Sequence, residues 1–341
     1  MSSLLSNEQP QSSPNGRRPG AILEVNGLSV DYVMERGTVS AVQDVSFDVA
    51  PGEFVGIVGE SGSGKSTLLF AIAHLLAPPA GIVAGSVIFR GVNLVGLTDK
   101  QLTAVRWRDI SVVMQSAMNA LNPVLSIAEQ FADAMRAHGV TSKQEIAERS
   151  AEVLKMVGID PVHLHSYPHQ LSGGMRQRSM IAMAMLFTPD LVIMDEPTSA
   201  LDVVAQRSMM VQIKELQQEF GFAVIFVTHD MSLVRHFTDR LMVMYAGQVA
   251  ESGSTQRMFE RPLHPYTVGL MEAFPSIHGP RVPLTGIPGR PPDLANPAGG
   301  CWFVPRCPRV MERCHTTAVP LYMLDGEQVR CLLYENGGVP G

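Results

Sequence analysis

The sequence lacks the features that would assign it to several large classes of protein. Its formal net charge is −6 over 341 residues, so no overall basic field is present to hold a nucleic acid backbone. No apolar run approaches the ~18–20 residues that cross a bilayer, and the longest runs, 181–187 and 222–227, have the size of core elements. These absences argue against a nucleic acid partner and against a membrane span in this chain.

The first twenty residues lack the marks of a secretory signal. They are rich in Ser, Asn, Gln, Pro and Gly, and no long apolar segment follows an early positive charge. Such a composition buries too little apolar surface to fold by itself. We interpret residues 1–20 as a disordered tail and expect a cytoplasmic location.

Cysteine is scarce, and its few copies are gathered near the C-terminus. All four lie between residues 301 and 331, with gaps of 5, 6 and 16 residues. Structural disulfides are rare in the cytoplasm, and the gaps lack the tight Cys-x₂₋₄-Cys pairs of most zinc modules. The clustering indicates one shared task, but the spacing alone does not name a ligand. The four are Cys301, Cys307, Cys314 and Cys331.

Short apolar runs predict a mostly parallel sheet wrapped by helices. The runs at 54–58, 191–194 and 222–227 are continuous and are separated by segments of helical spacing, which is typical of strands covered on both faces. Residues 22–48 instead alternate as half-buried strands do, and 86–90 is a further strand of this kind. An α/β fold follows.

Two regions depart from this pattern of alternating strands and helices. Between about residues 119 and 184 the strand signal disappears and helical spacing dominates, which predicts an inserted helical subdomain. After about residue 260 frequent prolines interrupt any long element. We therefore place a domain boundary there and expect a small loop-rich appendage over 261–341.

The most specific motif is a complete phosphate-binding loop. Residues 59–67 read Gly-Glu-Ser-Gly-Ser-Gly-Lys-Ser-Thr, between an apolar strand and an apolar helix. The glycines let backbone N–H groups converge on a polyphosphate at a positively polarised helix start, Lys65 reaches its β and γ oxygens, and Ser66 can ligate Mg²⁺. The chain is thus expected to bind a nucleoside triphosphate with Mg²⁺. The predicted contacts are Gly59, Ser61, Gly62, Ser63, Gly64, Lys65, Ser66 and Thr67.

Two adjacent carboxylates end a later buried strand. The run Leu-Val-Ile-Met precedes Asp195 and Glu196. Asp195 is placed to reach the Mg²⁺ shell, and Glu196 could polarise an attacking water as a general base. In isolation the pair could be an ordinary acidic junction between strand and loop, but its combination with the phosphate loop favours the catalytic interpretation.

A Ser-Gly-Gly turn opens a later helix and identifies the family. Ser172, Gly173 and Gly174 stand where a serine makes a good N-cap and where the helix start attracts an anion. By itself such a turn would be an ordinary cap. Together with the preceding motifs it resembles the signature of the ATP-binding cassette (ABC) family, in which it grips the γ-phosphate of ATP held by a second subunit.

This resemblance implies a fold and four further site residues. The fold would be a P-loop ABC ATPase over 21–260, with a RecA-like mostly parallel core sheet and an N-terminal antiparallel β-subdomain. Tyr32 resembles the aromatic residue that stacks on adenine, although a half-buried strand tyrosine would look the same. Gln115 resembles the glutamine that touches Mg²⁺ and the attacking water. Asp202 resembles a loop residue at the dimer interface, and His229 the histidine that hydrogen-bonds the γ-phosphate.

The C-terminal part resembles the extension of oligopeptide and dipeptide importer ATPases. The similarity rests on His-Pro-Tyr-Thr at 264–267 and on Gly-Cys-Trp-Phe-Val-Pro-Arg-Cys-Pro at 300–308. In that subgroup the four cysteines are implied to hold a [4Fe–4S] cluster, which suits Cys₄ ligation. Reduced buried thiols or a zinc ion remain the alternatives.

The resemblance implies the motor subunit of a bacterial peptide importer, peripheral on the inner face of the membrane. Its partners would be a second, similar ATPase, two transmembrane permease subunits and, indirectly, an extracytoplasmic solute-binding protein. One alternative is a soluble ABC ATPase acting on DNA or ribosomes. Only 107 positions separate Lys65 from Ser172, too few for the coiled-coil arms of chromosome-associated relatives. A degenerate regulatory cassette is a second alternative, disfavoured because Lys65, Asp195, Glu196 and His229 are all present.

Two other groups of residues are interpreted as structural. Three histidines at 163, 165 and 169 have no cysteine or paired carboxylate at ligand spacing and are assigned to a solvated loop. The methionines at 175, 180, 183 and 185 are assigned to the packed face of a helix.

Overall fold

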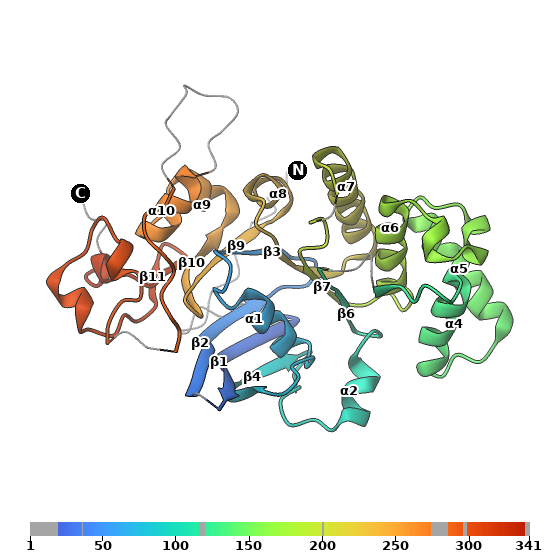
Figure 1. Ribbon diagram of the computed structural model, residues 1–341, viewed down its shortest axis with the longest axis horizontal. Coiled ribbons are helices and arrows are strands. Elements are labelled where there is room, and N and C mark those ends of the chain that lie inside the picture. Colours follow the sequence, from blue (N-terminus) through green and yellow to red (C-terminus); the bar gives the residue numbers. More distant parts are fainter. Residues whose placement is uncertain are drawn as a thin grey trace, which may run out of the picture.

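A computed structural model describes residues 20–337 apart from residue 36 and segments 116–119, 200, 274–285 and 296–298. Its centre is an eight-stranded sheet in the order β11-β12-β10-β9-β3-β8-β7-β6, with helices on its faces (Figure 1). The expected tail at 1–20 falls almost wholly outside the described residues, as does Ala200 in the loop before Asp202.

The middle of this sheet is parallel. β3 pairs in parallel with both β8 and β9, β8 with β7, and β7 with β6. Every residue of β3, β7 and β8 is buried, so the continuous apolar runs in the sequence are strands covered on both faces, as predicted. These strands are β3 (Phe54–Val58), β6 (Ile110–Val113), β7 (Leu191–Asp195), β8 (Ala223–Val227) and β9 (Arg240–Tyr245).

Helices join and cover these strands. The buried side chains of α1 pack with strands of both sheets, and those of α6 and α7 pack in a second cluster with β3, β7 and β8. α7 begins at the Asp202 cap and ends at Gly221, whose left-handed φ of 71° suits a glycine C-cap. The helices are α1 (Lys65–Ile72), α2 (Asp99–Val105), α6 (Gly173–Ala184), α7 (Val203–Phe220) and α8 (Met231–Phe237).

A second sheet is built from the N-terminal part of the chain. Its order is β2-β1-β4-β5, with antiparallel pairing throughout. The alternating pattern at 22–48 forms two strands of 12 and 13 residues, longer than the short strands that the sequence suggested. Their buried face packs on α1 and on the main sheet. The strands are β1 (Leu23–Met34), β2 (Gly37–Val49), β4 (Ala80–Phe89) and β5 (Val92–Asn93).

No strand is found among the described residues from 120 to 184. Two helices there begin at serine caps, because Ser126 and Ser142 accept hydrogen bonds from the backbone N–H groups of Glu129 and Glu145. Short 3₁₀ turns hold the three histidines, and Met183 and Met185 are buried. The elements are α4 (Ile127–Ala137), α5 (Lys143–Met156), η1 (Pro161–His165) and η2 (Pro168–Gln170). The limits proposed for the helical subdomain, about residues 119 and 184, stay a prediction.

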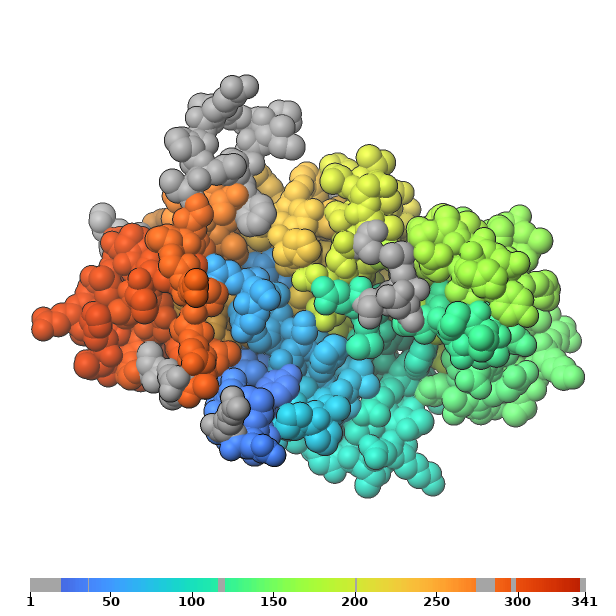
Figure 2. All heavy atoms as spheres, in the orientation of Figure 1, coloured from blue at the N-terminus to red at the C-terminus, as the bar shows by residue number. Residues whose placement is uncertain are grey.

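The C-terminal part is joined to the main sheet by backbone pairing. β12 pairs antiparallel with β10, and β11 with β12, so the sheet runs from the cassette into the extension. This region lies at one end of the long axis and the α4–α6 region at the other (Figure 2). Its elements are β10 (Gln248–Ser254), α9 (Thr255–Glu260), α10 (Pro265–Glu272), η3 (Val304–Arg306), η4 (Glu312–His315), β11 (Tyr322–Leu324), β12 (Glu327–Val329) and η5 (Leu332–Tyr334).

In the part of the chain that is described, no helix combines the length and the apolar character that spanning a membrane requires.

Candidate nucleotide site

The phosphate loop joins β3 to α1 by a backbone path that only glycine takes easily. Gly59, Gly62 and Gly64 have φ values of 150°, 79° and 98°. A Cβ on Gly59 would lie 2.2 Å from the carbonyl oxygen of Met244, and one on Gly64 would lie 2.3 Å from that of Ala41. The conformation and the close packing of the loop therefore both require glycine.

Lys65 is buried at the start of α1 and folds back over the loop. Its Nζ donates hydrogen bonds of 2.9 Å to the carbonyl oxygens of Gly59 and Glu60. Burial lowers the pKa of Lys65, and the carboxylates of Glu196, Asp195 and Glu60 oppose that change. A buried cation held by carbonyl groups is suited to attract an anionic ligand into the loop.

Ser66 and Asp195 meet beside this lysine. The Ser66 hydroxyl donates to Asp195 Oδ1 over 3.1 Å, although the two residues are 129 positions apart. Burial raises the pKa of Asp195, the hydrogen bond from Ser66 lowers it, and the neighbouring Glu196 raises it further. A hydroxyl and a carboxylate oxygen in contact are donors that Mg²⁺ prefers, so these two residues fit that ion.

The Glu196 carboxylate is held from two sides. Gln115 Nε2 donates to its Oε2 over 2.8 Å, and His229 Nδ1 lies 3.4 Å from its Oε1. The backbone of Glu196 has a left-handed φ of 45°, which is uncommon for a residue other than glycine. Its N–H is fixed by a 2.9 Å bond to the carbonyl oxygen of Val227. A cavity of about 280 Å³ opens beside Glu196 and His229.

These residues converge because they follow neighbouring parallel strands. The phosphate loop follows β3, Gln115 follows β6, Asp195 ends β7, and His229 follows β8, and all four strands are adjacent in the sheet. Ligand sites of open parallel sheets lie at this carboxyl edge.

Tyr32 reaches the same region from the second sheet. Its hydroxyl lies 3.2 Å from the Thr67 Oγ1, and either atom can be the donor. The contact brings the tyrosine to the first turn of α1.

The signature turn lies apart from this convergence. Ser172 caps α6 by accepting a 3.2 Å hydrogen bond from the N–H of Met175, as the sequence predicts. α6 stands with α4 and α5, well away from α1 (Figure 1). Ser172 is exposed, Gly173 and Gly174 are partly exposed, and Asp202 is exposed at the start of α7. One copy of the chain therefore does not bring Ser172 to its own Lys65.

Comparison with known protein families shows which family this chain belongs to. The family described as ABC transporter matches residues 42–199. The family described as oligopeptide/dipeptide transporter, C-terminal region, matches residues 250–314. The dipeptide transport ATP-binding protein DppD of Caldanaerobacter subterraneus is 41% identical over 319 residues, which cover 93% of this chain and 98% of that protein. The chain belongs to the ABC ATPase family, in its oligopeptide/dipeptide transporter branch.

Other relatives support the same assignment. The oligopeptide transport ATP-binding protein OppD of Salmonella typhimurium is 43% identical to this cassette, with 88% of this chain and 90% of that protein covered. Among solved structures, the dimeric ATP-binding cassette MJ0796 bound to ADP and Pi has a TM-score of 0.62 and 32% identity. It covers 68% of this chain and 98% of its own. The cassette is an ATPase of the ABC type, and the α/β architecture is the expected one.

The four cysteines share one small pocket of the C-terminal part, together with His264 and Phe303. Burial raises the pKa of the Cys301 and Cys307 thiols and raises that of Cys331 to about 11. Among the described residues, no group of three or more His, Cys, Asp or Glu side chains is arranged to hold a metal ion. The expected iron–sulfur site is therefore not supported by the described residues, although all four cysteines line one pocket.

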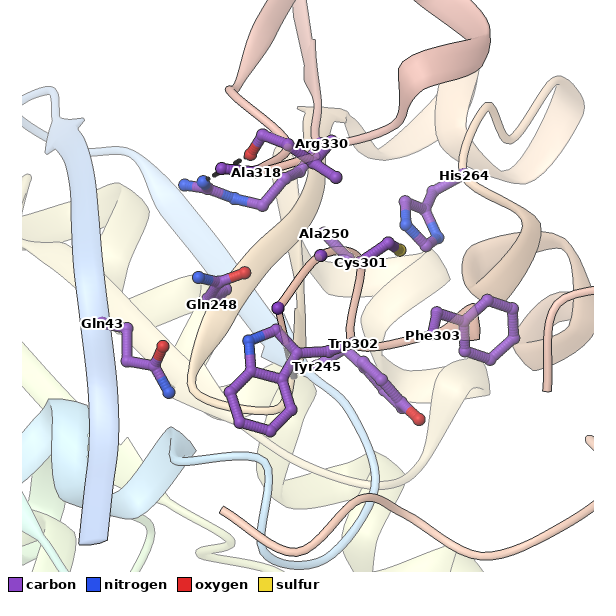
Figure 3. A pocket seen from close by; sticks show the side chains of 13 residues that line it. Gln43, Tyr245, Gln248, Ala250, His264, Cys301, Trp302, Phe303, Ala318 and Arg330 are labelled. Carbon is purple, nitrogen blue, oxygen red and sulfur yellow. Dashed lines mark hydrogen bonds between the residues drawn. The ribbon is translucent and has the colours of Figure 1, made fainter. Parts of the chain in front are cut away.

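A second cavity, of about 240 Å³, lies where the cassette and the extension meet. In Figure 3 Gln43 and Gln248 lie on the left of this cavity, with Arg330 above Gln248 and Trp302 below it. Cys301, Trp302 and Phe303 follow one another on its loop and point in different directions (Figure 3). The extension contacts the phosphate loop at Glu60, through Arg306 and Tyr266.

Sequence reasoning missed the residues that make those contacts. Arg306 forms two hydrogen bonds to the Glu60 carboxylate, and the Tyr266 hydroxyl accepts one from the Glu60 N–H. Tyr266 and Arg306 both lie in motifs that identify the extension, but no pattern in the sequence connects either of them to residue 60.

Proposed function

We propose that this ATPase powers the uptake of di- or oligopeptides, or of related small solutes, through an ABC importer. The names of its relatives are the main support, since they are dipeptide and oligopeptide transport ATP-binding proteins matched over nearly their whole length. The match of residues 250–314 to the C-terminal region of such transporters is independent of the cassette. In this proposal two transmembrane permease subunits and an extracytoplasmic solute-binding protein complete the transporter, and the chain works at the inner face of the membrane.

The site residues have distinct proposed roles. Lys65 and the backbone N–H groups of the phosphate loop bind the β- and γ-phosphates, while Tyr32 stacks on the adenine. Glu196 acts as the general base for the attacking water, which Gln115 positions and His229 helps to orient toward the γ-phosphate. The 2.8 Å and 3.4 Å contacts of Glu196 with Gln115 and His229 support this assignment, because they hold the base in one orientation.

Ser66, Gln115 and Asp195 are the proposed Mg²⁺ ligands. The ion, when bound, would neutralise charge that develops on the phosphate oxygens. Ser66 and Asp195 are already in contact, so the ion would replace one hydrogen bond and require little rearrangement of the protein.

The complete site would need two subunits. Ser172, Gly173 and Gly174 would cap the γ-phosphate of ATP bound by a partner, with Asp202 near the interface. The exposure of Ser172 and its separation from α1 support this arrangement. A second, similar ATPase is the proposed partner, and a homodimer is the alternative because the chain carries both halves of the site. ATP-driven closure and reopening would then be a ligand-driven population shift.

We propose further that the four cysteines hold a [4Fe–4S] cluster with a structural or regulatory role. The four cysteines line one pocket, and four thiolates are the donor set that such a cluster uses. Iron and sulfide analysis after anaerobic purification tests this, and zinc without sulfide would contradict it.

Transport can be tested directly. The complex isolated through this chain should contain two permease subunits, and in proteoliposomes it should accumulate a labelled dipeptide or tripeptide only with ATP and the solute-binding protein. The Glu196→Gln variant should fail to accumulate it. Accumulation of nickel but not of peptide would overturn the assignment of peptides as the cargo and leave the ATPase assignment intact.

A further inference from the structure

Glu60 is the one long side chain among the residues from Gly59 to Gly64, which are otherwise glycine and serine. Its carboxylate forms a two-pronged ion pair with Arg306. Arg306 Nη1 lies 2.6 Å from Glu60 Oε2, and Nη2 lies 2.7 Å from Oε1. The two residues are 246 positions apart in the chain. The Arg306 side chain is 3% exposed and that of Glu60 is 26% exposed, so water screens this pair only in part.

The Glu60 peptide group is held as well. Its N–H donates a 2.9 Å hydrogen bond to the Tyr266 hydroxyl, and its carbonyl oxygen accepts one of 2.9 Å from Lys65. Side chain, N–H and carbonyl are thus each fixed by a different residue, two of which belong to the C-terminal extension. The backbone of the phosphate loop at residue 60 therefore depends on the extension.

Arg306 is itself held in place by two aromatic rings and a backbone carbonyl group. Its guanidinium lies 5.8 Å from the ring centroid of Tyr245 and 6.0 Å from that of Phe303, and its Nε donates to the carbonyl oxygen of Pro288 over 2.8 Å. The cation–π contacts already restrict the Arg306 side chain, and its guanidinium is planar. Arg306 therefore loses less conformational freedom when it pairs with Glu60. The guanidinium is thus held in position to receive Glu60.

The turn that carries Arg306 is bounded by two of the four cysteines. Val304 N–H donates to the Cys301 carbonyl oxygen, and Cys307 N–H donates to that of Val304. Cys301 N–H in turn donates to the Cys314 carbonyl oxygen over 2.8 Å. A displacement at the cysteine pocket would therefore move Arg306 directly.

We propose that Arg306 is a positioning residue of the nucleotide site, and that the Glu60–Arg306 pair couples the cysteine segment to nucleotide affinity. The pair keeps the phosphate loop in the conformation that receives the triphosphate. The inference rests on nucleotide binding at this loop and is independent of the cargo. By linkage, a bound nucleotide stabilises the cysteine segment by the same factor by which that segment strengthens nucleotide binding.

Binding of MgADP to the purified full chain tests the first half of the proposal, because ADP probes the phosphate loop without requiring a second subunit. Calorimetry should give a Kd about five-fold or more above wild type for Arg306→Met, with partial rescue by Arg306→Lys. In the assembled transporter the same variant should raise the KM for MgATP while kcat stays within about two-fold. Arg90→Met is the matched control, because it removes an exposed arginine–carboxylate pair with Asp190 that lies outside the cysteine segment.

A double-mutant cycle separates the pair from a general loss of structure. Glu60→Gln leaves the extension unchanged, so it tests the proposal even if Arg306→Met folds poorly. The double variant Glu60→Gln with Arg306→Met should bind MgADP no more weakly than the worse single variant. An unchanged Kd in both single variants, or fully additive losses in the double variant, would overturn the proposal.

The second half is tested at the cysteines. The rate of attack on this segment should fall by about five-fold or more when MgADP is added to the wild-type protein. A thiol reagent measures that rate where the cysteines are free, and loss of iron to a chelator measures it where they hold the proposed cluster. In Glu60→Gln and Arg306→Met this protection should disappear, even at MgADP concentrations that saturate each variant. Protection that persists in both variants would exclude the pair as the connection, whatever solute the transporter carries.

Discussion

Gln115 donates a 2.8 Å hydrogen bond to Glu196, although the two residues lie 81 positions apart and follow different strands. The contact connects the start of the region leading to α4 with the carboxylate beside the nucleotide site. Movement of that region would therefore alter the orientation of Glu196, and with it the position of the proposed general base.

The Glu196→Gln variant should bind MgATP with an affinity close to that of wild type but hydrolyse it at a rate lower by about 10²–10⁴-fold, because the amide cannot accept a proton. Steady-state ATPase assays of the assembled transporter and nucleotide binding to the purified chain provide the two measurements. Lys65→Ala is the contrasting variant, since it should weaken binding itself. A Glu196→Gln protein that still turns over ATP would remove this residue from its proposed role.

The Ser172→Arg variant should leave MgADP binding by the isolated chain unchanged, because Ser172 is distant from its own phosphate loop. It should abolish ATP-driven association of subunits and ATPase activity. Ser142→Arg is a matched control: Ser142 also caps a helix and is also exposed, so it reports the loss of a serine cap, typically about 1 kcal/mol. Association by size-exclusion chromatography with ATP distinguishes the two, and equal effects would mean that only capping was lost.

Gly64→Ala should destabilise the fold far more than Gly62→Ala. Both residues have left-handed φ values, which costs an L-residue roughly 1–2 kcal/mol. A Cβ at Gly64 would also lie 2.3 Å from the backbone oxygen of Ala41, whereas one at Gly62 meets nothing within 4 Å. Thermal unfolding without nucleotide should show a larger fall in Tm for Gly64→Ala, and similar Tm values would contradict the close packing of α1 against β2.

We expect Glu251 and His264 to make the free energy of unfolding depend on pH in opposite directions. Burial raises the pKa of Glu251 from 4.5 to about 7, so the folded state binds a proton more tightly than the unfolded chain. Its stabilising contribution is complete below pH ~4.5 and is lost as pH rises to about 7, by up to roughly 3 kcal/mol. Burial lowers the pKa of His264 from 6.5 to about 4, so its contribution is present above pH 6.5 and is lost as pH falls to about 4.

The Glu251→Gln variant should remove the contribution that opposes that of His264. Between pH 4.5 and 6.5 the two slopes oppose each other in the wild-type protein, whereas in the variant the free energy of unfolding should rise steadily with pH over that range. Urea unfolding at a series of pH values measures this. Glu312→Gln, at an exposed carboxylate of the same extension, should leave the wild-type profile unchanged. A Glu251→Gln profile that matches wild type would show that Glu251 does not titrate in this range.

The convergence of the proposed catalytic residues could be predicted because each of their motifs directly follows an apolar strand. Parallel strands bring their carboxyl ends together, so Lys65, Asp195 and His229 could be placed at one edge without knowledge of their distances. The Ser172 cap was equally local, since it depends only on the residues that begin α6. Hydrophobic periodicity and helix capping both depend on residues that are close together in the sequence, so they can be recognised without the fold.

The connection of the extension to the cassette could not be predicted in this way. β12 is a strand of three residues, too short for a periodic signal, yet it pairs with β10 across some eighty positions. The ion pair of Glu60 and Arg306 depends on a tertiary arrangement that places distant turns in contact. Buried carboxylates such as Glu251 look like ordinary polar strand residues in the sequence, and only the fold removes them from water.

Because β12 supplies hydrogen bonds to β10, a truncation after residue 260 would do more than remove a separate module. It would leave unpaired backbone groups along β10, and an open strand of this kind invites pairing with other molecules and aggregation. The natural limit of the folding unit therefore lies beyond the cassette motifs, and a soluble fragment requires the C-terminal hairpin even when only nucleotide chemistry is of interest.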